Sequence, residues 1–270
     1  MCPHWLRLRL YFELATRSFR RHVTYRAANW AGLATNAFFG LLRSYIFIAV
    51  FAAQPLAAGY TLADSLTYAW ITQALLAFVY MWNWWEIAHT IRSGQIASDL
   101  CRPFDFFGFW LSQDIGRAAY HIVFRGIPCY LIGAATFGIA LPARVDTWLA
   151  FLVCVGLALL LSFGFRFLVN LSAFWFLDIR GVNYITGTVA TFFSGILIPN
   201  AFFPDWLRTL SDWLPFQGML YVPTAVFLGK LQGAELAIVL AREAAWVVVL
   251  LLAGRLVLGV ATRRLVVQGG

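Results

Sequence analysis

Long apolar segments separated by short polar ones dominate the chain. A bilayer's hydrocarbon core is roughly 30 Å thick and an α-helix rises about 1.5 Å per residue, so segments of this kind cross it as helices. The apolar segments cover residues 28–53, 62–85, 118–141, 147–171, 183–198 and 236–261. This pattern predicts an all-α integral membrane protein with six transmembrane helices.

The first segment, residues 1–27, intersperses six arginines with bulky apolar residues. Its apolar runs are too short and too interrupted for a signal peptide, and no small-residue cleavage site follows them. We predict an amphipathic helix that lies along the cytoplasmic membrane surface. The alternative is a basic tail that only sets the topology.

Residues 204–235 are half apolar and are punctuated by prolines and glycines, which favours short broken helices over a full span. We predict that these helices form a lid at the outer interface. The lid residues are Phe202, Phe203, Pro204, Trp206, Pro215 and Phe216.

The composition supports the membrane class. The 270 residues are 61% hydrophobic and 12% charged, whereas soluble domains are roughly 45–50% apolar and about 25% charged. Trp82, Trp84 and Trp85, at the end of the second span, are interpreted as an interfacial anchoring belt, with a tryptophan-lined binding site as the alternative. We expect a single transmembrane domain over residues 1–270, with a bundle at 28–261 and a cytoplasmic tail at 262–270.

Basic residues are distributed unevenly between the two predicted sides. Six arginines lie in the N-terminal segment, three after the second span, one after the fourth and two in the tail, against three basic residues in the opposite loops. By the positive-inside rule, both termini are cytoplasmic in a plasma membrane, which we take to be a bacterial inner membrane. Arginines beside apolar spans suit lipid headgroups, and nothing in the sequence favours nucleic-acid binding.

Several charges fall within the spans, where each costs several kcal/mol unless it snorkels or pairs. Arg125, Arg166 and Arg255 lie in the cytoplasmic halves of their helices and are interpreted as snorkelling. Arg43 lies nearer the middle of its span, and Arg242 is expected to pair locally with Glu243. The candidate intramembrane charges are Arg43, Arg125, Arg166, Arg242 and Glu243.

The sequence offers little support for catalysis or metal binding. Its four cysteines are far apart and its four histidines lack ligand spacing. Gly229-Lys230 lacks the earlier glycine of a phosphate-binding loop and is followed by Leu231. We therefore expect no catalytic, metal or cofactor site in this chain, and any ATPase to be a separate polypeptide.

A short polar stretch, residues 91–103, lies between the second and third spans. Gly94 and Pro103 bracket two to three helical turns, with Ile96 and Leu100 on one face and Asp99 and Arg102 on another. We interpret it as an apolar knob with flanking charges that docks into a groove of a partner, the alternative being a solvated loop. The predicted docking residues are Gly94, Ile96, Asp99, Leu100, Arg102 and Pro103.

Several motifs together resemble the ABC type-2 membrane permeases. They are the loop from Ser93 to Asp105, the run from Phe174 to Gly181, Ser194-Gly195 with Pro199, the run from Phe202 to Leu207, and Leu214-Pro215-Phe216. The resemblance covers essentially the whole chain. Ser98 and Asn200 depart from the family pattern, and Asn200 bears on the outer gate.

The resemblance implies a six-span half-transporter that pairs with a second, identical or homologous permease and with two cytosolic ATPase subunits. ATP and Mg²⁺ would bind to those ATPases, and residues 91–103 would be the coupling helix. Relatives export drugs, antibiotics, lipids or polysaccharides, so we predict an exporter of hydrophobic or amphipathic substrates. The alternatives are a lipid flippase or importer, or an integral membrane enzyme built on Asp99, Asp105 and Asp114.

Overall fold

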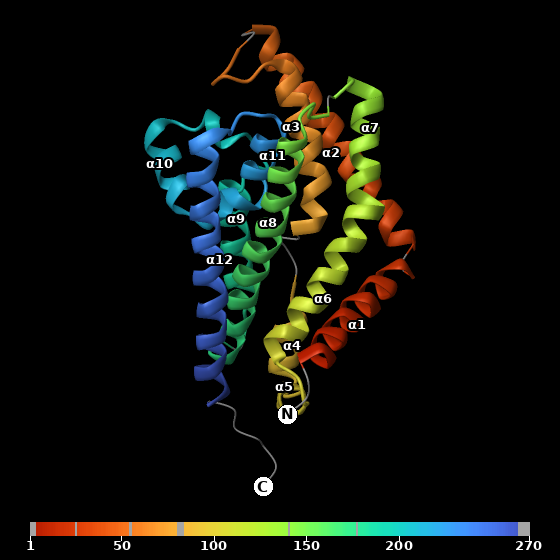
Figure 1. The fold of residues 1–270 in the computed structure, drawn as a ribbon, viewed down its shortest axis with the longest axis vertical. Coiled ribbons are helices and arrows are strands. Elements are labelled where there is room, and N and C mark those ends of the chain that lie inside the picture. The colour runs from red at the N-terminus through yellow and green to blue at the C-terminus, as the bar shows by residue number, and fades with distance from the viewer. Residues whose placement is uncertain are drawn as a thin grey trace.

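The described part of the protein is helical throughout. The computed structural model describes residues 4–24, 26–53, 56–79, 84–139, 141–176 and 178–263, and in these ranges the only β-type pairing is an isolated bridge between Ala57 and Tyr60. Figure 1 shows most of the long helices running along the long axis of the molecule. The predicted all-α class is confirmed.

The helices follow one another with short connections. The longer ones are α1 (His4–Val23), α2 (Arg26–Ala53), α3 (Leu62–Val79), α6 (Phe106–His121), α7 (Ile127–Phe137), α8 (Val145–Leu171), α9 (Arg180–Phe193) and α12 (Gly233–Thr262). The shorter ones are α4 (Glu86–Arg92), α5 (Ile96–Leu100), η1 (Ile122–Gly126), η2 (Ser172–Phe174), η3 (Asn200–Phe202), α10 (Asp205–Trp213), η4 (Pro215–Met219) and α11 (Tyr221–Phe227).

Four helical stretches are long and apolar enough to cross a membrane: Ala27–Ala53, Leu62–Val79, Val145–Phe174 and Gly233–Thr262. They coincide with four of the six predicted spans. The third predicted span falls on the run from α6 through η1 to α7. The fifth falls on α9, whose 14 residues rise only about 21 Å. The multi-pass class is established, and the count of six stays a prediction.

A π-helical turn, η1, interrupts the run from α6 to α7, and Pro128 explains it. Proline has no N–H, so the carbonyl of Phe124, four residues earlier, loses its helical hydrogen bond. The side-chain amide of Asn29 on α2 donates to that carbonyl at 3.4 Å. The irregular turn is thus stabilised from a neighbouring helix, as is usual for such turns. Apolarity alone had not predicted it.

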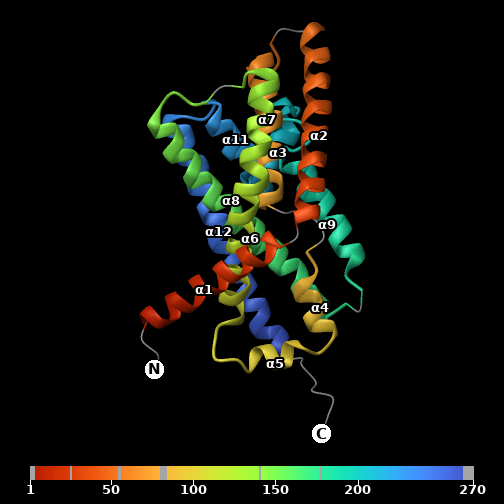
Figure 2. The ribbon, with the colours of Figure 1, turned by 90° about the vertical axis from the view of Figure 1, so that its right-hand side faces the viewer.

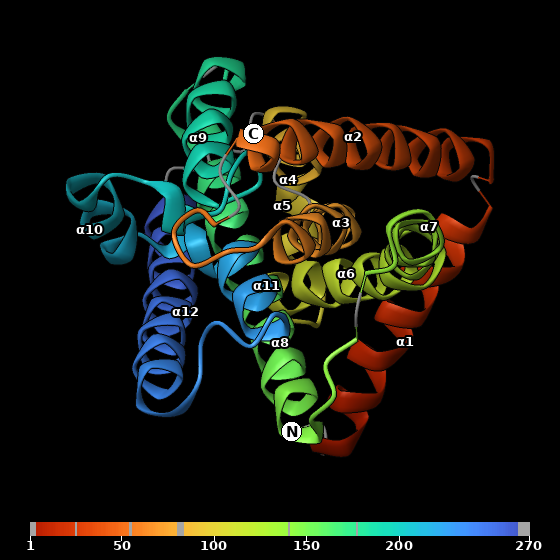
Figure 3. The same ribbon diagram turned by 90° about the horizontal axis from the view of Figure 1, so that it is seen from above.

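Helix α3 is the centre of one half of the bundle. Viewed along the long axis in Figure 3, it lies among α2, α6, α7 and α11. Tyr68 and Trp70 on it are completely buried. Glycines allow the close approach of its neighbours, because a Cβ on Gly133 of α7 would lie 2.4 Å from the Trp70 indole.

Helices α8 and α12 pack together in the other half. Gly164 on α8 lies against Leu250, where an added Cβ would meet the Leu250 Cβ at 2.9 Å. Gly254 on α12 receives the ring of Phe167 in the same way, at 3.1 Å. Two small residues therefore set how closely these long apolar helices approach.

The two ends of the molecule differ. Helix α5 and the last turn of α12 lie at one end, whereas α10, α11 and the α2–α3 connection lie toward the other (Figures 1 and 2). Helix α1 crosses the half that contains α5 and packs against α6 (Figure 2). This arrangement fits the predicted division of loops between two sides. The predicted features at residues 54–55, 80–83, including Trp82, and 264–270 lie outside the described residues.

The predicted short helices after Pro204 are present as α10, η4 and α11. They are not all surface elements, however. Helix α10 exposes Trp206 and Trp213, whereas the residues of η4 and most of α11 are buried against α8 and other helices. Part of this segment, η4 and most of α11, is therefore inserted into the bundle, and only the rest lies at the surface as a lid.

Candidate functional site

The predicted docking stretch folds as two short helices joined by a turn at Gly94. Helix α4 ends there because Gly94 adopts a left-handed conformation with φ of 75°, which glycine takes without a steric penalty. The Gly94 N–H donates to the carbonyl of Ile91 at 3.2 Å. Helix α5 has only five residues, so it is shorter than the two to three turns predicted.

One face of this stretch is built into the protein core. Ile96 is fully buried and packs in one cluster with Ile87, Phe106, Phe107 and Leu171, and Leu100 packs against the same cluster. The interpretation of Ile96 and Leu100 as an apolar knob for a partner is therefore wrong. Burial in this chain's own core satisfies the apolar face, and the helical spacing alone does not show which surface a face meets.

The other face is exposed and polar. Arg92, Gly94, Gln95, Arg102 and Pro103 are all exposed at this end of the molecule. Asp99, which is half-buried, pairs with Arg102 at 3.3 Å across one helical turn. A partner that contacts α4 and α5 from outside meets this polar face, to which the free thiol of Cys101 also belongs.

Helix α4 is fastened to the end of α8 by Asn170. Its Oδ1 atom accepts a hydrogen bond from the Ala88 N–H at 3.1 Å, and its Nδ2 donates to the Trp84 carbonyl at 2.9 Å. Asn170 is buried, so each of these bonds satisfies a group that would otherwise be costly to bury. Asn170 therefore links α4, and Trp84 just before it, to the end of α8.

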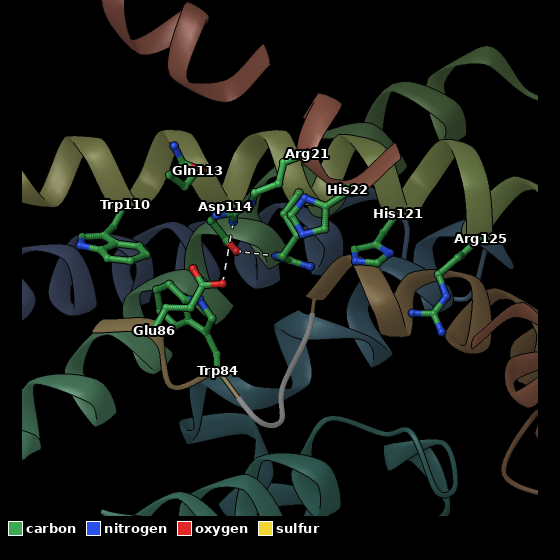
Figure 4. Close-up of a pocket in the computed structure, with 10 residues that line it drawn as sticks. Arg21, His22, Trp84, Glu86, Trp110, Gln113, Asp114, His121 and Arg125 are labelled. Atoms are coloured by element: carbon green, nitrogen blue, oxygen red, sulfur yellow. Dashed lines mark hydrogen bonds and ion pairs between the residues drawn. The ribbon is translucent and has the colours of Figure 1, made fainter. Parts of the chain in front are cut away.

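A buried ion network lies deeper in the bundle, at Asp114 on α6 (Figure 4). Arg166 on α8 donates to both carboxylate oxygens of Asp114, at 3.2 and 2.7 Å. Arg117 donates to Asp114 Oδ1 at 2.8 Å and to the carbonyls of Ala77 and Phe78 on α3, both at 2.8 Å. Charge-assisted, bidentate bonds of this kind are the strong ones. The network therefore ties α3, α6 and α8 together.

Two predictions are corrected here. Arg166 does not snorkel: its side chain is 4% exposed and donates to Asp114 and to the Ser162 carbonyl. Trp84 is not an interfacial anchor, because it is buried and its ring lies 4.7 Å from the Arg166 guanidinium carbon. Asp114 precedes the predicted third span at 118–141, and its partner Arg166 is 52 positions away, so no local pattern pointed to the pair.

The remaining intramembrane charges are scattered. Arg43 donates to Thr72 Oγ1 at 2.8 Å, and Arg125 lies against Gly32 of α2. Arg242 pairs with Asp212 of α10 at 3.8 Å, so the expected local pairing with Glu243 is wrong. Glu243 is buried, and its Oε2 atom has no hydrogen-bond partner among the described residues.

Arg255 is consistent with the snorkelling interpretation. Its side chain is 62% exposed, lies over the Phe107 ring and approaches Asp105 at 3.7 Å. Asp105 itself caps α6 by accepting from the Gly108 N–H at 2.7 Å. Asp99, Asp105 and Asp114 therefore pair with different arginines and do not form one acidic site.

The predicted lid residues divide into two groups. Phe203, Pro215 and Phe216 are buried, whereas Pro204 and Trp206 are exposed and Phe202 is half-buried. Asn200, the departure from the family pattern, fastens this region by donating to the Phe193 carbonyl at 2.9 Å and to Ser211 Oγ at 2.8 Å. No group of three or more His, Cys, Asp or Glu side chains suited to a metal ion occurs in the described ranges.

The family comparison covers the same elements. Residues 39–269 match the model of the ABC-2 family transporter protein, which includes every element described here except α1 and the first part of α2. A search of curated proteins found no match. Because the matched region is most of the chain and includes the α4–α5 stretch and both halves of the bundle, the chain belongs to the ABC-2 family of transporter proteins.

Proposed function

We propose that this transport subunit is the membrane half of an ATP-driven exporter, moved by a separate ATPase that docks on the exposed face of α4 and α5. Membership of the ABC-2 family implies an ATPase partner; ATP and Mg²⁺ would bind to that partner. The observation that carries the proposal is the two-sided structure of this stretch. Its outer face is polar and exposed, and its inner face is part of the core.

This two-sided structure suits the transmission of force. A push on α5 reaches Phe106 and Phe107 on α6 through the buried side chain of Ile96. A push on α4 reaches α8 through Asn170. Because a packed interior has low compressibility, such displacements are passed on rather than absorbed. The Asp114 network then makes α3 follow α6 and α8.

The proposed substrate is hydrophobic or amphipathic. A cavity of about 350 Å³ lies between α3, the η1–α7 run, α8 and α11. Its volume falls within the roughly 300–1,000 Å³ that small-molecule sites occupy. Its lining residues, which include Ile71, Tyr130, Trp148, Phe151 and Phe227, are predominantly apolar. This supports an apolar substrate or an acyl chain rather than a sugar or an ion.

The proposed topology has six spans, cytoplasmic termini and a cytoplasmic α4–α5 stretch, with α10 and α11 on the outside. The basic asymmetry of the loops supports it. A second permease would complete the pathway, whether a second copy of this chain or a homologue. A flippase or importer on the same scaffold is the alternative, because the direction of transport depends on the ATP-driven cycle.

Transport in inside-out vesicles tests this proposal. The permease is expressed with the ATPase that co-purifies with it, and a fluorescent hydrophobic dye and a fluorescent phospholipid are used as probes. We expect ATP-dependent accumulation of a probe inside the vesicles, and its loss in the Arg92→Glu, Arg102→Glu double variant. Arg20→Glu on α1 is the matched control, since Arg20 is exposed and distant in sequence from α4 and α5. ATP-dependent depletion of the probe would contradict export.

A further inference from the structure

A second cavity, of about 250 Å³, lies where α1, α6 and the start of α4 meet (Figure 4). It is polar and basic, in contrast to the apolar cavity described above. The residues that line it are Arg21, His22, Trp84, Glu86, Trp110, Gln113, Asp114, Arg117, His121 and Arg125. Asp114 and Arg117 also belong to the proposed coupling, whereas Arg21, His22 and His121 have no part in it.

The charges around the cavity do not balance. Asp114 neutralises only one of its two arginine partners, so the buried network carries a surplus positive charge. Glu86 faces Arg21 across the cavity at 3.8 Å. The charged groups are Arg21, Arg117, Arg125 and Arg166 against Glu86 and Asp114, which leaves two positive charges in excess. A partly enclosed site with this excess concentrates anions.

Donors are available within the cavity. The Nδ1 atom of His121 is buried and has no hydrogen-bond partner among the described residues. Arg21 is half exposed, and its contact with Glu86 is long, so its guanidinium is free to turn toward a ligand. The planar fork of arginine matches the oxygens of a phosphate group. Arg117, in contrast, is committed to Asp114 and to two backbone carbonyls.

The position of the cavity indicates the source of the anion. Arg21 and His22 come from the last turn of α1. The same helix exposes Leu8 and Phe12, each to 71%. A helix with arginines and exposed apolar side chains of this kind lies in the membrane interface, at the depth of the lipid headgroups. The cavity is smaller than the roughly 300 Å³ at which sites for drug-sized ligands begin. It therefore suits a headgroup and not a whole amphiphile.

We propose that this cavity binds the phosphate group of an anionic membrane lipid, held by Arg21, Arg125 and His121. The negative charge of Glu86 repels the phosphate, but Arg21 partly neutralises that charge. The binding goes beyond the proposed export function, because it requires neither ATP nor the ATPase partner.

Native mass spectrometry of the purified permease in detergent tests this directly. Equal amounts of phosphatidylglycerol and phosphatidylcholine are added, and the ratio of the two retained lipids is measured. We expect wild-type protein to retain phosphatidylglycerol preferentially. The Arg21→Gln variant should lower this preference about tenfold, the effect expected from removal of one charge-assisted hydrogen bond. Arg20→Gln is the matched control, since Arg20 is exposed on the same helix but does not line the cavity.

Each result has a defined meaning. Equal losses in Arg21→Gln and Arg20→Gln would overturn the site, because they would reflect general surface charge. The absence of any preference in the wild type would overturn it as well. Competition by millimolar inorganic phosphate would support phosphate recognition by the cavity, and retention of phosphatidylglycerol in the presence of that phosphate would show that the lipid is the tighter ligand. Arg125→Gln provides a second variant on a different helix, and we expect it to lower the same preference.

Discussion

Two carboxyl groups are buried in the bundle, and their surroundings are opposite. Asp114 receives hydrogen bonds from two arginines and joins three helices. Glu243 on α12 lies among apolar residues of α8 and η4, and its Oε2 atom has no hydrogen-bond partner within the described ranges. A Cβ on Gly218 would lie 1.4 Å from that atom, so the glycine is what makes room for the carboxyl group.

The two carboxyl groups therefore affect stability differently. Asp114 is part of a structural joint, a buried ion network that holds helices together, whereas the burial of Glu243 costs stability. A buried carboxylate with matched donors holds its helices in one arrangement, whereas a buried polar group without a partner costs free energy. The Asp114 network lies between the α4–α5 stretch and α3, where the proposed transmission of force needs a rigid connection. Glu243 lies in the half of the bundle that contains the inserted η4 segment, and its Oε2 atom has no hydrogen-bond partner in the part of the chain that the structure describes.

The largest expected effect comes from Asp114→Asn. The substitution keeps the shape of the side chain but leaves Arg117 and Arg166 buried without a counter-charge, which typically costs about 3–5 kcal/mol of folding free energy. Thermal unfolding in detergent measures it. Asp178→Asn is the control, because Asp178 pairs with Arg180 at the surface and should have little effect. Equal stability of the two variants would show that the network is not a structural joint.

Arg166→Met should cost less than Asp114→Asn. The remaining pair of Asp114 and Arg117 is electrically balanced, so no uncompensated charge stays buried. The loss of the hydrogen bonds between Arg166 and Asp114 should cost about 1.5–3 kcal/mol in all. Unfolding of both variants under the same conditions gives the order. If Arg166→Met lowers stability more than Asp114→Asn does, packing of the Arg166 guanidinium against Trp84 contributes more than charge balance.

Glu243→Met should be neutral or stabilising, by up to about 1 kcal/mol, because it replaces an unpartnered buried polar group with an apolar side chain of similar length. The midpoint of thermal unfolding should remain unchanged or rise. Gly218→Ala is the informative companion: it should destabilise the wild type through its clash with Glu243. A marked fall in stability for Glu243→Met would mean that the carboxyl group has a partner that this account lacks.

The smallest effect concerns pH. Burial against α6 lowers the pKa of His22 on α1 below its usual value near 6.5. Below that pH the undocked helix takes up a proton that the docked helix does not, so the docking of α1 weakens as pH falls from about 7 to 5. The protection factors of the α1 amides, which correct hydrogen exchange for its intrinsic pH dependence, should fall over this range in the wild type and remain flat in His22→Gln. An equal fall in both proteins would show that a group other than His22 causes the pH dependence.

The sequence predicted elements whose signal is local. Long, predominantly apolar runs marked the helices at residues 28–53 and 147–171, and prolines marked the short helices after Pro204. Features that depend on tertiary contacts were missed. Ile96 was assigned to a partner surface because its spacing does not distinguish a partner from this chain's own core. The bond between Asp114 and Arg166 joins two helices, so neither residue's neighbours in sequence reveal it.

The most direct test of the account uses the thiol of Cys101, the residue that follows α5, which is exposed while Cys129 and Cys154 are buried. In a Cys2→Ser protein, a membrane-impermeant maleimide is applied to inside-out and right-side-out vesicles, with and without the ATPase subunit. The account predicts labelling only in inside-out vesicles, and protection when the ATPase is bound. Labelling in right-side-out vesicles, or full labelling while the ATPase is bound and transport is active, would contradict docking on this face.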